Sequence, residues 1–425
     1  MPSIMCDKKV LHTRGFEMKG MTIKYLTCFV CYFAFMIAFA GTSATGAKDS
    51  AFASDDIKPG AWRTGLYFPM LEGKRIAVAG NHTSRIGDTH LVDTMLAEGL
   101  ELVKVFSPEH GFRGEAAAGE AVESEVDEVT GLPVISLYGT NRRPTPRQLR
   151  DVDIIVFDIQ DVGTRFYTYI STMTYLMEEA AEQDIPFLIL DRPNPNGHYV
   201  DGPVLEPAYT SFVGLHSVPI VHGMTVGEYA YMVYGEGWMG EDVRMDLRVV
   251  PVEDYTHESR YHLPEAPSPN LPNMHAVYLY PSLCLFEGTS LSVGRGTDKP
   301  FQIFGHPDLP AEYYPYRFTP ESVPAAPDPP AKGQSCNGLY PGDTPLPKLE
   351  KKDRLNLSWL ITSYRHYQGE TFFNDFFDKL AGNAALRNQI QNGWSADEIR
   401  ESWQEELKQF KAIRSQYLLY PDFEE

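Results

Sequence analysis

The feature that most constrains the fold of this chain is a regular alternation of short apolar runs with helix-like segments. Five such runs lie between residues 61 and 235, and each is almost continuously apolar, as expected of strands covered on both faces. Strand–helix–strand alternation is typical of a doubly wound parallel sheet, so we predict an α/β, Rossmann-like domain over residues 61–235. The expected strands are Arg75–Ala79, Leu102–Phe106, Val134–Leu137, Asp153–Phe157 and Phe187–Leu190, and the expected helices are Leu91–Glu98, Pro146–Leu149 and Ile170–Gln183.

Residues 236–425 differ in character. The stretch 262–350 is rich in Pro and Gly, and amphipathic segments follow it. A chain of 425 residues exceeds what one hydrophobic core usually serves, so we expect a second, smaller α+β domain packed against the first. Its expected strands are Arg244–Val250 and Ala276–Leu279, and its expected helices are Leu355–Tyr367, Asn374–Leu380 and Ala396–Ile413.

The first 47 residues have the pattern of a secretory signal. Lys19 and Lys24 precede the uncharged run Tyr25–Ala40, and small residues follow it up to Ala47. The apolar run is shorter than the roughly 20 residues needed to span a bilayer. We therefore expect export with cleavage rather than anchoring. The expected destination is the periplasm, with the extracellular medium as the alternative, and we expect no membrane association after cleavage.

Composition excludes several classes of function. The formal net charge is −20, with no compensating basic run, so nucleic acids and anionic lipid surfaces are poor partners. The chain lacks G-x-G-x-x-G after its first expected strand, a Walker A loop, a G-x-S-x-G elbow and H-E-x-x-H. We therefore expect no nucleotide cofactor, no metal and no ordinary serine nucleophile. Cleavage leaves Cys284 and Cys336, which are either bridged or free.

Polar segments follow four of the five expected strands. Ligands of open parallel sheets bind beyond the carboxyl ends of the strands, so these segments are expected to meet at one edge. Amides, carboxylates, His and Arg at that edge suit a polyhydroxylated ligand and proton transfer. Residues of the second half that are expected to contact the ligand join the same set. The proposed substrate-binding residues are Asn81, Gln160, Arg165, Tyr167, Tyr169, Asp191, Arg192, Asn194, His222, Asn270 and Arg295.

Several of these residues also fit structural roles. Asn81 suits an Asx turn or a helix cap, and Asp191 suits a local turn with an ion pair. Arg295 either pairs with a substrate carboxylate or ties two loops together. Thr225 and Glu228 have the spacing of a capping box, which explains Glu228 better than catalysis does.

Glu109 is the strongest catalytic candidate. It follows Pro108 and precedes Gly111 by two positions, in a loop that leaves a buried strand. A partly desolvated carboxyl there would have a raised pKa and would suit a general acid. The second catalytic group stays open among His110, Asp158, Asp161, Asp191 and Glu206, of which the first three are our catalytic candidates beside Glu109. If the two groups cleave a glycoside, the distance between them decides whether the configuration at the sugar carbon is retained or inverted.

Seven motifs resemble the exo-β-N-acetylmuramidases of the NamZ type, formerly a domain of unknown function. They are SPEHGFRG (107–114), FDIQDVGTRFYTY (157–169), LDRPNPNG (190–197), SFVGLHSVPIVHGMTVGE (211–228), PSPNLP (267–272), YPSLCLFEGT (280–289) and VGRGTDKPFQ (293–302). The resemblance runs in order from about residue 60 to 420. It implies a Rossmann-like domain, a distinctive C-terminal α/β domain and an active site in the cleft between them.

The resemblance also implies an activity. Its members release terminal non-reducing N-acetylmuramic acid (MurNAc) from peptidoglycan fragments, and Glu109 corresponds to their proposed catalytic glutamate. Asp201 stands where relatives are expected to have Glu, which puts a catalytic role at that position in doubt. An Arg in the cleft would recognise the lactyl carboxylate, with Arg165, Arg192 and Arg295 as the alternatives. The expected partners are muropeptides or disaccharides.

Two other functions compete with the glycosidase. A metal-dependent hydrolase would use Glu109, His110, Asp158 and Asp161 as ligands and would lose activity with a chelator. A periplasmic sugar-binding protein would also be exported and rich in aromatic residues, but it would need no buried acid.

Overall fold

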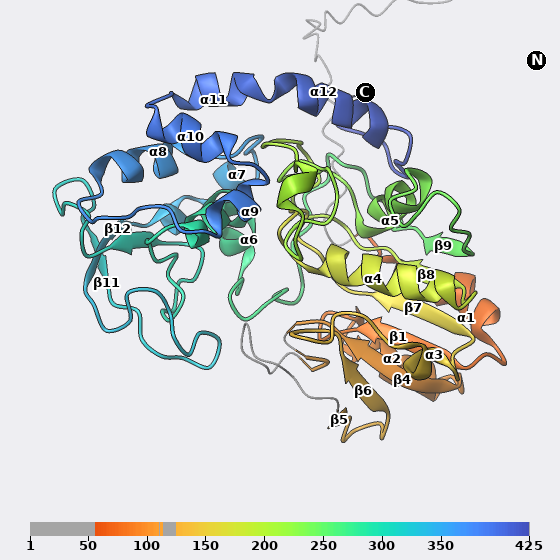
Figure 1. The fold of residues 1–425 in the computed structure, drawn as a ribbon. Helices are drawn as coiled ribbons and strands as arrows, with labels where there is room; N and C mark the ends of the chain where they lie inside the picture. The colour runs from red at the N-terminus through yellow and green to blue at the C-terminus, as the bar shows by residue number, and fades with distance from the viewer. Residues whose placement is uncertain (1–55, 110, 114–124, 425) are drawn as a thin grey trace, which may run out of the picture. The chain divides into compact units, whose positions relative to one another are not determined.

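A seven-stranded sheet organises the N-terminal half of the chain (Figure 1). The computed structural model describes residues 56–109, 111–113 and 125–424, which belong to the compact unit 50–425. The signal sequence expected in residues 1–47 and the candidate His110 lie outside the described residues. The sheet order is β5-β6-β4-β1-β7-β8-β9. The strands are β1 (Ile76–Gly80), β4 (Leu102–Ser107), β5 (Glu125–Val126), β6 (Pro133–Ser136), β7 (Ile154–Asp158), β8 (Phe187–Leu190) and β9 (Leu247–Val250).

The prediction of a parallel, doubly wound sheet is confirmed. Every strand pair is parallel except β5 with β6. Numbered along the chain, the six parallel strands have the order 3-2-1-4-5-6, which is that of dinucleotide-binding folds. The strand expected at Arg244–Val250 is β9, which lies in this sheet beside β8 and not in the second domain, where the sequence pattern placed it.

Alternate residues of the strands enter two different cores. Ala77, Phe157 and Ile189 pack with the helices α3 (Pro146–Leu149), α4 (Tyr169–Glu182) and α5 (Val226–Gly235). Val78, Val156 and Leu190 pack on the other face. The helices of that face are α1 (Thr64–Leu71) and α2 (Leu91–Ala97). Coverage of both faces is why the strands are continuously apolar.

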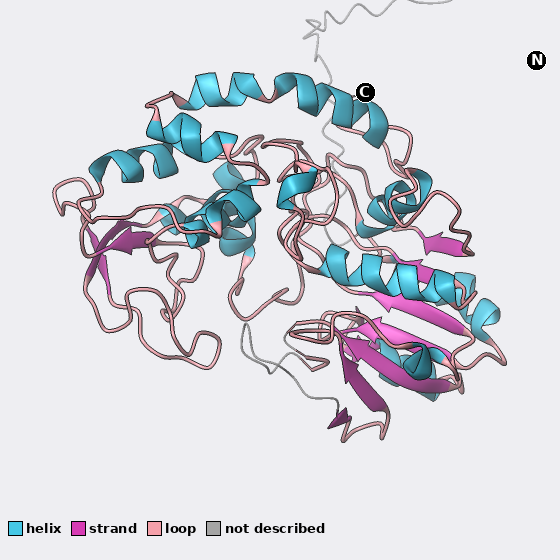
Figure 2. Cartoon of the chain, in the orientation of Figure 1, coloured by secondary structure: helices cyan, strands magenta, loops and turns pink. Residues whose placement is uncertain are grey.

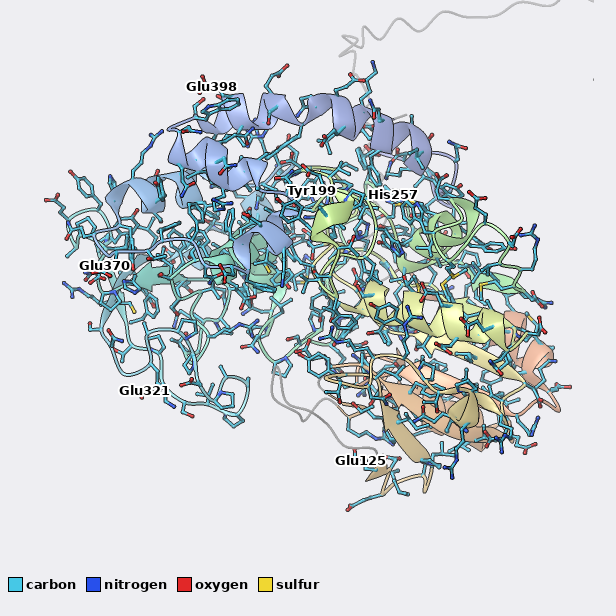
Figure 3. All side chains as sticks on the ribbon, in the orientation of Figure 1. Glu125, Tyr199, His257, Glu321, Glu370 and Glu398 are labelled. Atoms are coloured by element: carbon cyan, nitrogen blue, oxygen red, sulfur yellow. The ribbon has the colours of Figure 1, made fainter. Side chains whose placement is uncertain are left out.

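Side chains at the helix starts set where the helices begin. Thr145 caps α3 with Gln148 in a capping box, and Pro146 occupies the first turn. The predicted capping box of Thr225 and Glu228 is present at the start of α5. A second Glu228 oxygen lies 3.0 Å from Nε2 of His257, which is labelled in Figure 3, and both side chains are fully buried. Glu228 therefore has a structural role.

The C-terminal half combines a three-stranded antiparallel sheet with helices that pack around it (Figure 2). Its core is continuous with the α4–α5 side of the large sheet, because Leu283, Phe304, Phe377 and Phe410 belong to the same apolar cluster. None of the described helices combines the length and the hydrophobicity that a bilayer-spanning helix needs. The strands are β10 (Phe304–His306), β11 (Tyr316–Phe318) and β12 (Cys336–Leu339); the helices are α6 (Met274–Leu283), α7 (Leu346–Leu349), α8 (Leu357–His366), α9 (Phe377–Ala381), α10 (Ala385–Gln391), α11 (Ala396–Ser402) and α12 (Gln404–Arg414).

Two secondary-structure predictions for this half were wrong. Ala276–Leu279 is part of helix α6, not a strand, because the Asn273 side chain caps the backbone N–H of Ala276 and starts a helix there. All of α6 from Ala276 to Leu283 is buried, so its sequence lacks the polar face that marks a surface helix. The single helix expected over Ala396–Ile413 is two, separated at the buried Trp403.

Short elements complete the fold. A two-stranded ribbon joins β1 to α2, and four 3-10 turns lie between larger elements of the described chain. They are β2 (Arg85–Ile86), β3 (Thr89–His90), η1 (Gly60–Trp62), η2 (Pro207–Tyr209), η3 (Cys284–Gly288) and η4 (Pro341–Asp343). Cys284 and Cys336 are both buried free thiols, so they form no bridge.

Candidate active site

A cavity of about 830 Å³ lies where loops of the large sheet face the C-terminal half. The loops after β4, β6 and β7 supply one side of it, and η3, the 325–330 loop and α9 supply the other. A narrow extension of about 60 Å³ shares Glu109, Phe166, Thr168, Tyr280 and Arg295 with it and forms its inner end. The backbone N–H of Glu321, which is labelled in Figure 3, donates to the carbonyl of Gly296 at 2.9 Å. The chain after Glu321 leads to residues 325–330 of the cavity wall.

Glu109 lies at the inner end of this cavity, and the chain on both sides of it is anchored. β4 ends at the buried Ser107, and the N–H of Gly111 donates to the carbonyl of Pro108 at 3.2 Å, with Gly111 at a φ of 75°. Phe112 is buried against the ring of His90. A turn between two fixed points therefore presents the Glu109 carboxyl to the cavity.

Tyr138 lines the cavity together with Glu109. Burial, together with the negative charge of Glu109, raises the pKa of Tyr138 well above its usual value. Tyr138 follows β6, the neighbour of β4 in the sheet. The hydroxyl therefore stays protonated at any physiological pH and can act as a hydrogen-bond donor in the cavity wall.

Aromatic rings form the inner wall. Tyr167 stacks edge-on against Tyr169 and Tyr280, with centroids 4.7 and 5.8 Å apart, and Tyr280 contacts Phe301 in the same way at 4.9 Å. The hydroxyl of Tyr167 donates to the carbonyl of Pro267 at 2.8 Å, which fixes the ring. Such a wall offers apolar faces to a sugar ring while its hydroxyls are held by the protein.

Arg295 and Glu287 form an ion pair in the wall, with Nε and Oε1 2.6 Å apart. Burial opposes the charge on Arg295, but the carboxylate of Glu287 outweighs it and raises the pKa of Arg295. Arg295 sits between Gly294 and Gly296, both at a φ of +79°, a left-handed conformation that glycine adopts readily. The turn that these glycines allow directs the guanidinium into the cavity.

The structure brings five of the residues predicted for the site to the cavity or its inner end. They are Glu109, Tyr167, Tyr169, Asn270 and Arg295. The other described candidates lie outside the lining and make contacts within the protein.

Three amide candidates stabilise the loops behind the wall. Asn81 accepts from the N–H of Thr83 at 3.0 Å and donates to the hydroxyl of Tyr169 at 3.2 Å. Asn194 accepts from the N–H of Asn196 at 2.8 Å, which makes a second Asx turn. Gln160 donates to the carbonyl of Pro193 at 2.8 Å.

The charged candidates are held by partners other than a ligand. Asp158 and Arg192 form a fully buried bidentate pair. Arg165 donates to four backbone carbonyls, and burial lowers its pKa to about 9. Neither Arg165 nor Arg192 lines the cavity, so Arg295 is the remaining member of the three arginines considered for a substrate carboxylate.

Asp191, His222 and Asp201 are interior residues. Asp191 accepts from the N–H of Gly227 and from two hydroxyls, and burial raises its pKa to about 6. His222 accepts from the N–H of Met224, and burial lowers its pKa to about 3. Asp201 accepts from the N–H of Leu355 at 2.7 Å.

Asp161 is the one described catalytic candidate outside the lining that keeps a buried oxygen without a hydrogen-bond partner. Its Oδ1 accepts from the N–H of Gly163 at 2.6 Å, while Oδ2 has no partner. Burial raises the pKa of Asp161 to about 7. Glu206, also considered as a second catalytic group, is exposed and does not line the cavity.

Several residues of the lining were not predicted from the sequence. Tyr138 and Arg142 follow a predicted strand at the same edge as Glu109, so the rule that led to Glu109 could have found them. Thr168 lies inside a motif that was recognised. Ser211 and Phe212 begin another of the quoted motifs, whereas Lys379 carried no signal, because only the tertiary fold brings α9 to the cavity. Glu287 lies inside the quoted motif YPSLCLFEGT (280–289).

The chain matches known proteins over almost all of its described length. The family profile described as exo-beta-N-acetylmuramidase NamZ, N-terminal, matches residues 76–275, and the corresponding C-terminal profile matches 278–420. The peptidoglycan beta-N-acetylmuramidase NamZ of Bacillus subtilis strain 168 is 40% identical over 406 residues, which cover 89% of this chain and 96% of the relative.

Two crystal structures of DUF1343 family proteins from Bacteroides fragilis share the fold. One has a TM-score of 0.80 at 48% identity and the other 0.73 at 29%, and each match covers 86% of this chain and 99% of the solved chain. The profiles, the curated relative and the two structures agree. The chain therefore belongs to the NamZ exo-β-N-acetylmuramidase family of glycoside hydrolases.

Proposed function

We propose that this enzyme releases terminal non-reducing β-MurNAc from peptidoglycan fragments, with Glu109 as the general acid. The observation that carries the proposal is the position of Glu109 at the inner end of a cavity whose wall is aromatic and contains Arg295. The similarity to the peptidoglycan beta-N-acetylmuramidase of Bacillus subtilis supports the same substrate class.

The cavity residues divide the work of such a reaction. The Glu109 carboxyl protonates the oxygen of the scissile glycosidic bond, and water adds to the anomeric carbon, so that MurNAc and the shortened fragment are released. The rings of Tyr167 and Tyr280 face the apolar side of the sugar. Arg295 binds the lactyl carboxylate, which MurNAc has and N-acetylglucosamine (GlcNAc) lacks. The cavity volume of about 830 Å³ suits a sugar with part of its leaving group.

The test compares two leaving groups. The leaving group of a chromogenic β-MurNAc glycoside departs without protonation. The GlcNAc of the disaccharide MurNAc–GlcNAc is a poorer leaving group, and its departure needs an acid. We expect Glu109→Gln to lower kcat at least about 100-fold on the disaccharide, and less on the chromogenic glycoside. The matched control Glu98→Gln, an exposed residue outside the cavity, should retain full activity.

Further arms separate the competing functions. The β-GlcNAc glycoside should be a poor substrate, and EDTA should not change the rate. Loss of activity with EDTA would favour a metal-dependent hydrolase. If the folded wild-type protein releases no MurNAc, the proposal is wrong and a sugar-binding function is favoured.

We further propose that residues 1–47 direct export and are removed, so that the enzyme acts in the periplasm. The support is the charge pattern around Tyr25–Ala40 and the small residues after it. N-terminal sequencing of protein from the periplasmic fraction of producing cells tests this. A start between residues 41 and 48 is expected. Full-length protein in the membrane fraction would contradict it.

A further inference from the structure

The mouth of the cavity has two cations that the proposed chemistry does not use. Arg142 and Lys379 line the cavity, and both are exposed, whereas Arg295 lies at the partly buried inner end. They come from opposite sides: Arg142 from the loop after β6 and Lys379 from α9. In the part of the chain that the structure describes, neither is in an ion pair.

Neither cation is paired with an acidic residue of the lining in the part of the chain that the structure describes. Three acidic side chains line the cavity within the described residues. Glu287 is paired with Arg295, and Asp328 lies 3.7 Å from Nζ of Lys332. Glu109 belongs to the inner end. Two cations without an ion-pair partner among the described residues lie at one opening of a protein whose net charge is −20, and an anionic group of a ligand can pair with them there.

Arg142 is held in position by a stack of rings. Its guanidinium lies 4.2 Å from the centroid of Phe212, and Phe212 stacks on Tyr175 at 6.0 Å. The guanidinium of Arg143 lies 4.1 Å from the ring centroid of Tyr175, and Arg143 forms an ion pair with Glu178 on α4. A side chain that is oriented before the ligand arrives loses less entropy on binding.

We propose that Arg142 and Lys379 form a second anion subsite, which binds a carboxylate on the leaving-group side of the substrate. This rests on the proposed function, because a terminal MurNAc at the inner end places the rest of the glycan at the mouth. In an alternating MurNAc–GlcNAc chain the next carboxylate is the lactyl group of the following MurNAc. A peptide stem on that sugar would offer the same chemistry.

The test measures binding to the mouth without cleavage. The probes are the disaccharide GlcNAc–MurNAc, the same disaccharide with a peptide stem, and N,N′-diacetylchitobiose, which has no carboxylate. Calorimetric titrations compare wild type, Arg142→Gln, Lys379→Gln and the double variant. Arg147→Gln, an exposed Arg outside the cavity, is the matched control.

We expect wild type to prefer GlcNAc–MurNAc over chitobiose, and each single variant to reduce that preference by about three- to five-fold. Salt at about 1 M should reduce it in wild type as well. A preference that appears only with the stem peptide identifies the peptide carboxylates as the source, and one already present without it identifies the lactyl group. Arg147→Gln should behave as wild type.

The subsite would be overturned if wild type bound the carboxylate-bearing probes and chitobiose with equal affinity. It would also be overturned if the double variant kept the preference for the carboxylate-bearing probes. The result is independent of turnover. If the β-MurNAc glycoside is not cleaved but the carboxylate preference depends on Arg142 and Lys379, the proposed reaction fails and the subsite stands.

Discussion

The guanidinium of Arg192 holds the carboxylate of Asp158 through two hydrogen bonds, from Nε to Oδ1 at 2.6 Å and from Nη2 to Oδ2 at 2.9 Å. Asp158 is the last residue of β7, and Arg192 follows β8, so the pair ties together two adjacent strand ends. Their side chains are 0% and 4% exposed. The geometry makes the pair part of the support behind the cavity.

Removing one partner of this pair should destabilise the protein strongly. In Arg192→Met the Asp158 carboxylate stays buried without its counter-charge, which costs about 3–5 kcal/mol in the free energy of unfolding. Arg248→Met is the matched control, because its pair with Asp246 is half-exposed and is worth about 0–1 kcal/mol. Urea unfolding monitored by fluorescence gives both values. Equal losses for the two variants would show that burial of the Asp158 pair contributes nothing.

Replacing Arg165 should destabilise the fold as strongly as replacing Arg192, because hydrogen bonds are lost and not because a charge is left unpaired. It donates to the carbonyls of Pro203 and Val218 and to those of Leu380 and Ala381 at the end of α9. Arg165→Met leaves four buried acceptors without donors, so we expect a loss of at least about 4 kcal/mol. Arg150→Met, an exposed Arg, is the control. Denaturant midpoints check the difference, and a loss below that of ordinary surface substitutions would contradict it.

Much of the large sheet could be predicted, because strands buried on both faces have short, continuous apolar runs between helices. The same criterion misassigned Ala276–Leu279, since a helix buried all round is equally apolar. The position of β9 depends on pairing with β8, which no local pattern encodes.

The candidate site was predictable only in part. The rule that ligands bind beyond strand ends led to Glu109, but it also selected the segments after β1, β7 and β8. There the polar side chains bind one another and the backbone, as Asn81 does with Tyr169. Sequence patterns do not distinguish a polar group that serves a ligand from one that serves a turn. Phe212 and Lys379 reach the cavity through the tertiary fold alone.

Asp161 should make stability fall as pH rises. Its folded pKa is raised to about 7 by burial, above the unfolded value near 4, so the folded state holds a proton that the unfolded state releases. The stabilisation is complete below about pH 4, declines between about 4 and 7 and is absent above, with a total on the order of 4 kcal/mol. Asp161→Asn removes this dependence and keeps the acceptor for the N–H of Gly163.

The measurement is urea unfolding of wild type and Asp161→Asn at pH 5 and pH 8. We expect the stability of the variant relative to wild type to increase between these two values. Asp153→Asn is the control, because that surface carboxyl has a pKa lowered by Arg75 to about 2 and does not titrate in this range. A difference between Asp161→Asn and wild type that is the same at both pH values would rule out Asp161 as the titrating group.

Arg295 should determine the preference for MurNAc over GlcNAc. It is the cation that lines the inner end of the cavity, as Glu109 does, and its Nε is fixed by Glu287. In Arg295→Gln the lactyl carboxylate loses a charge-assisted partner worth about 1.5–3 kcal/mol, so the ratio of kcat/KM for the two chromogenic glycosides should fall about 10- to 150-fold. The change should appear mainly in KM, because the carboxylate is bound in both ground state and transition state.

Arg295→Gln also leaves Glu287 without its partner, so Glu287→Gln/Arg295→Gln is measured beside it. In the double variant no charge is left unpaired, and a loss of selectivity there reflects the missing guanidinium alone. Arg317→Gln, an exposed Arg of β11 outside the cavity, should keep the wild-type ratio. If the folded double variant keeps the wild-type ratio of kcat/KM for the two glycosides, Arg295 does not recognise the lactyl carboxylate. Arg142 is then the next residue to test.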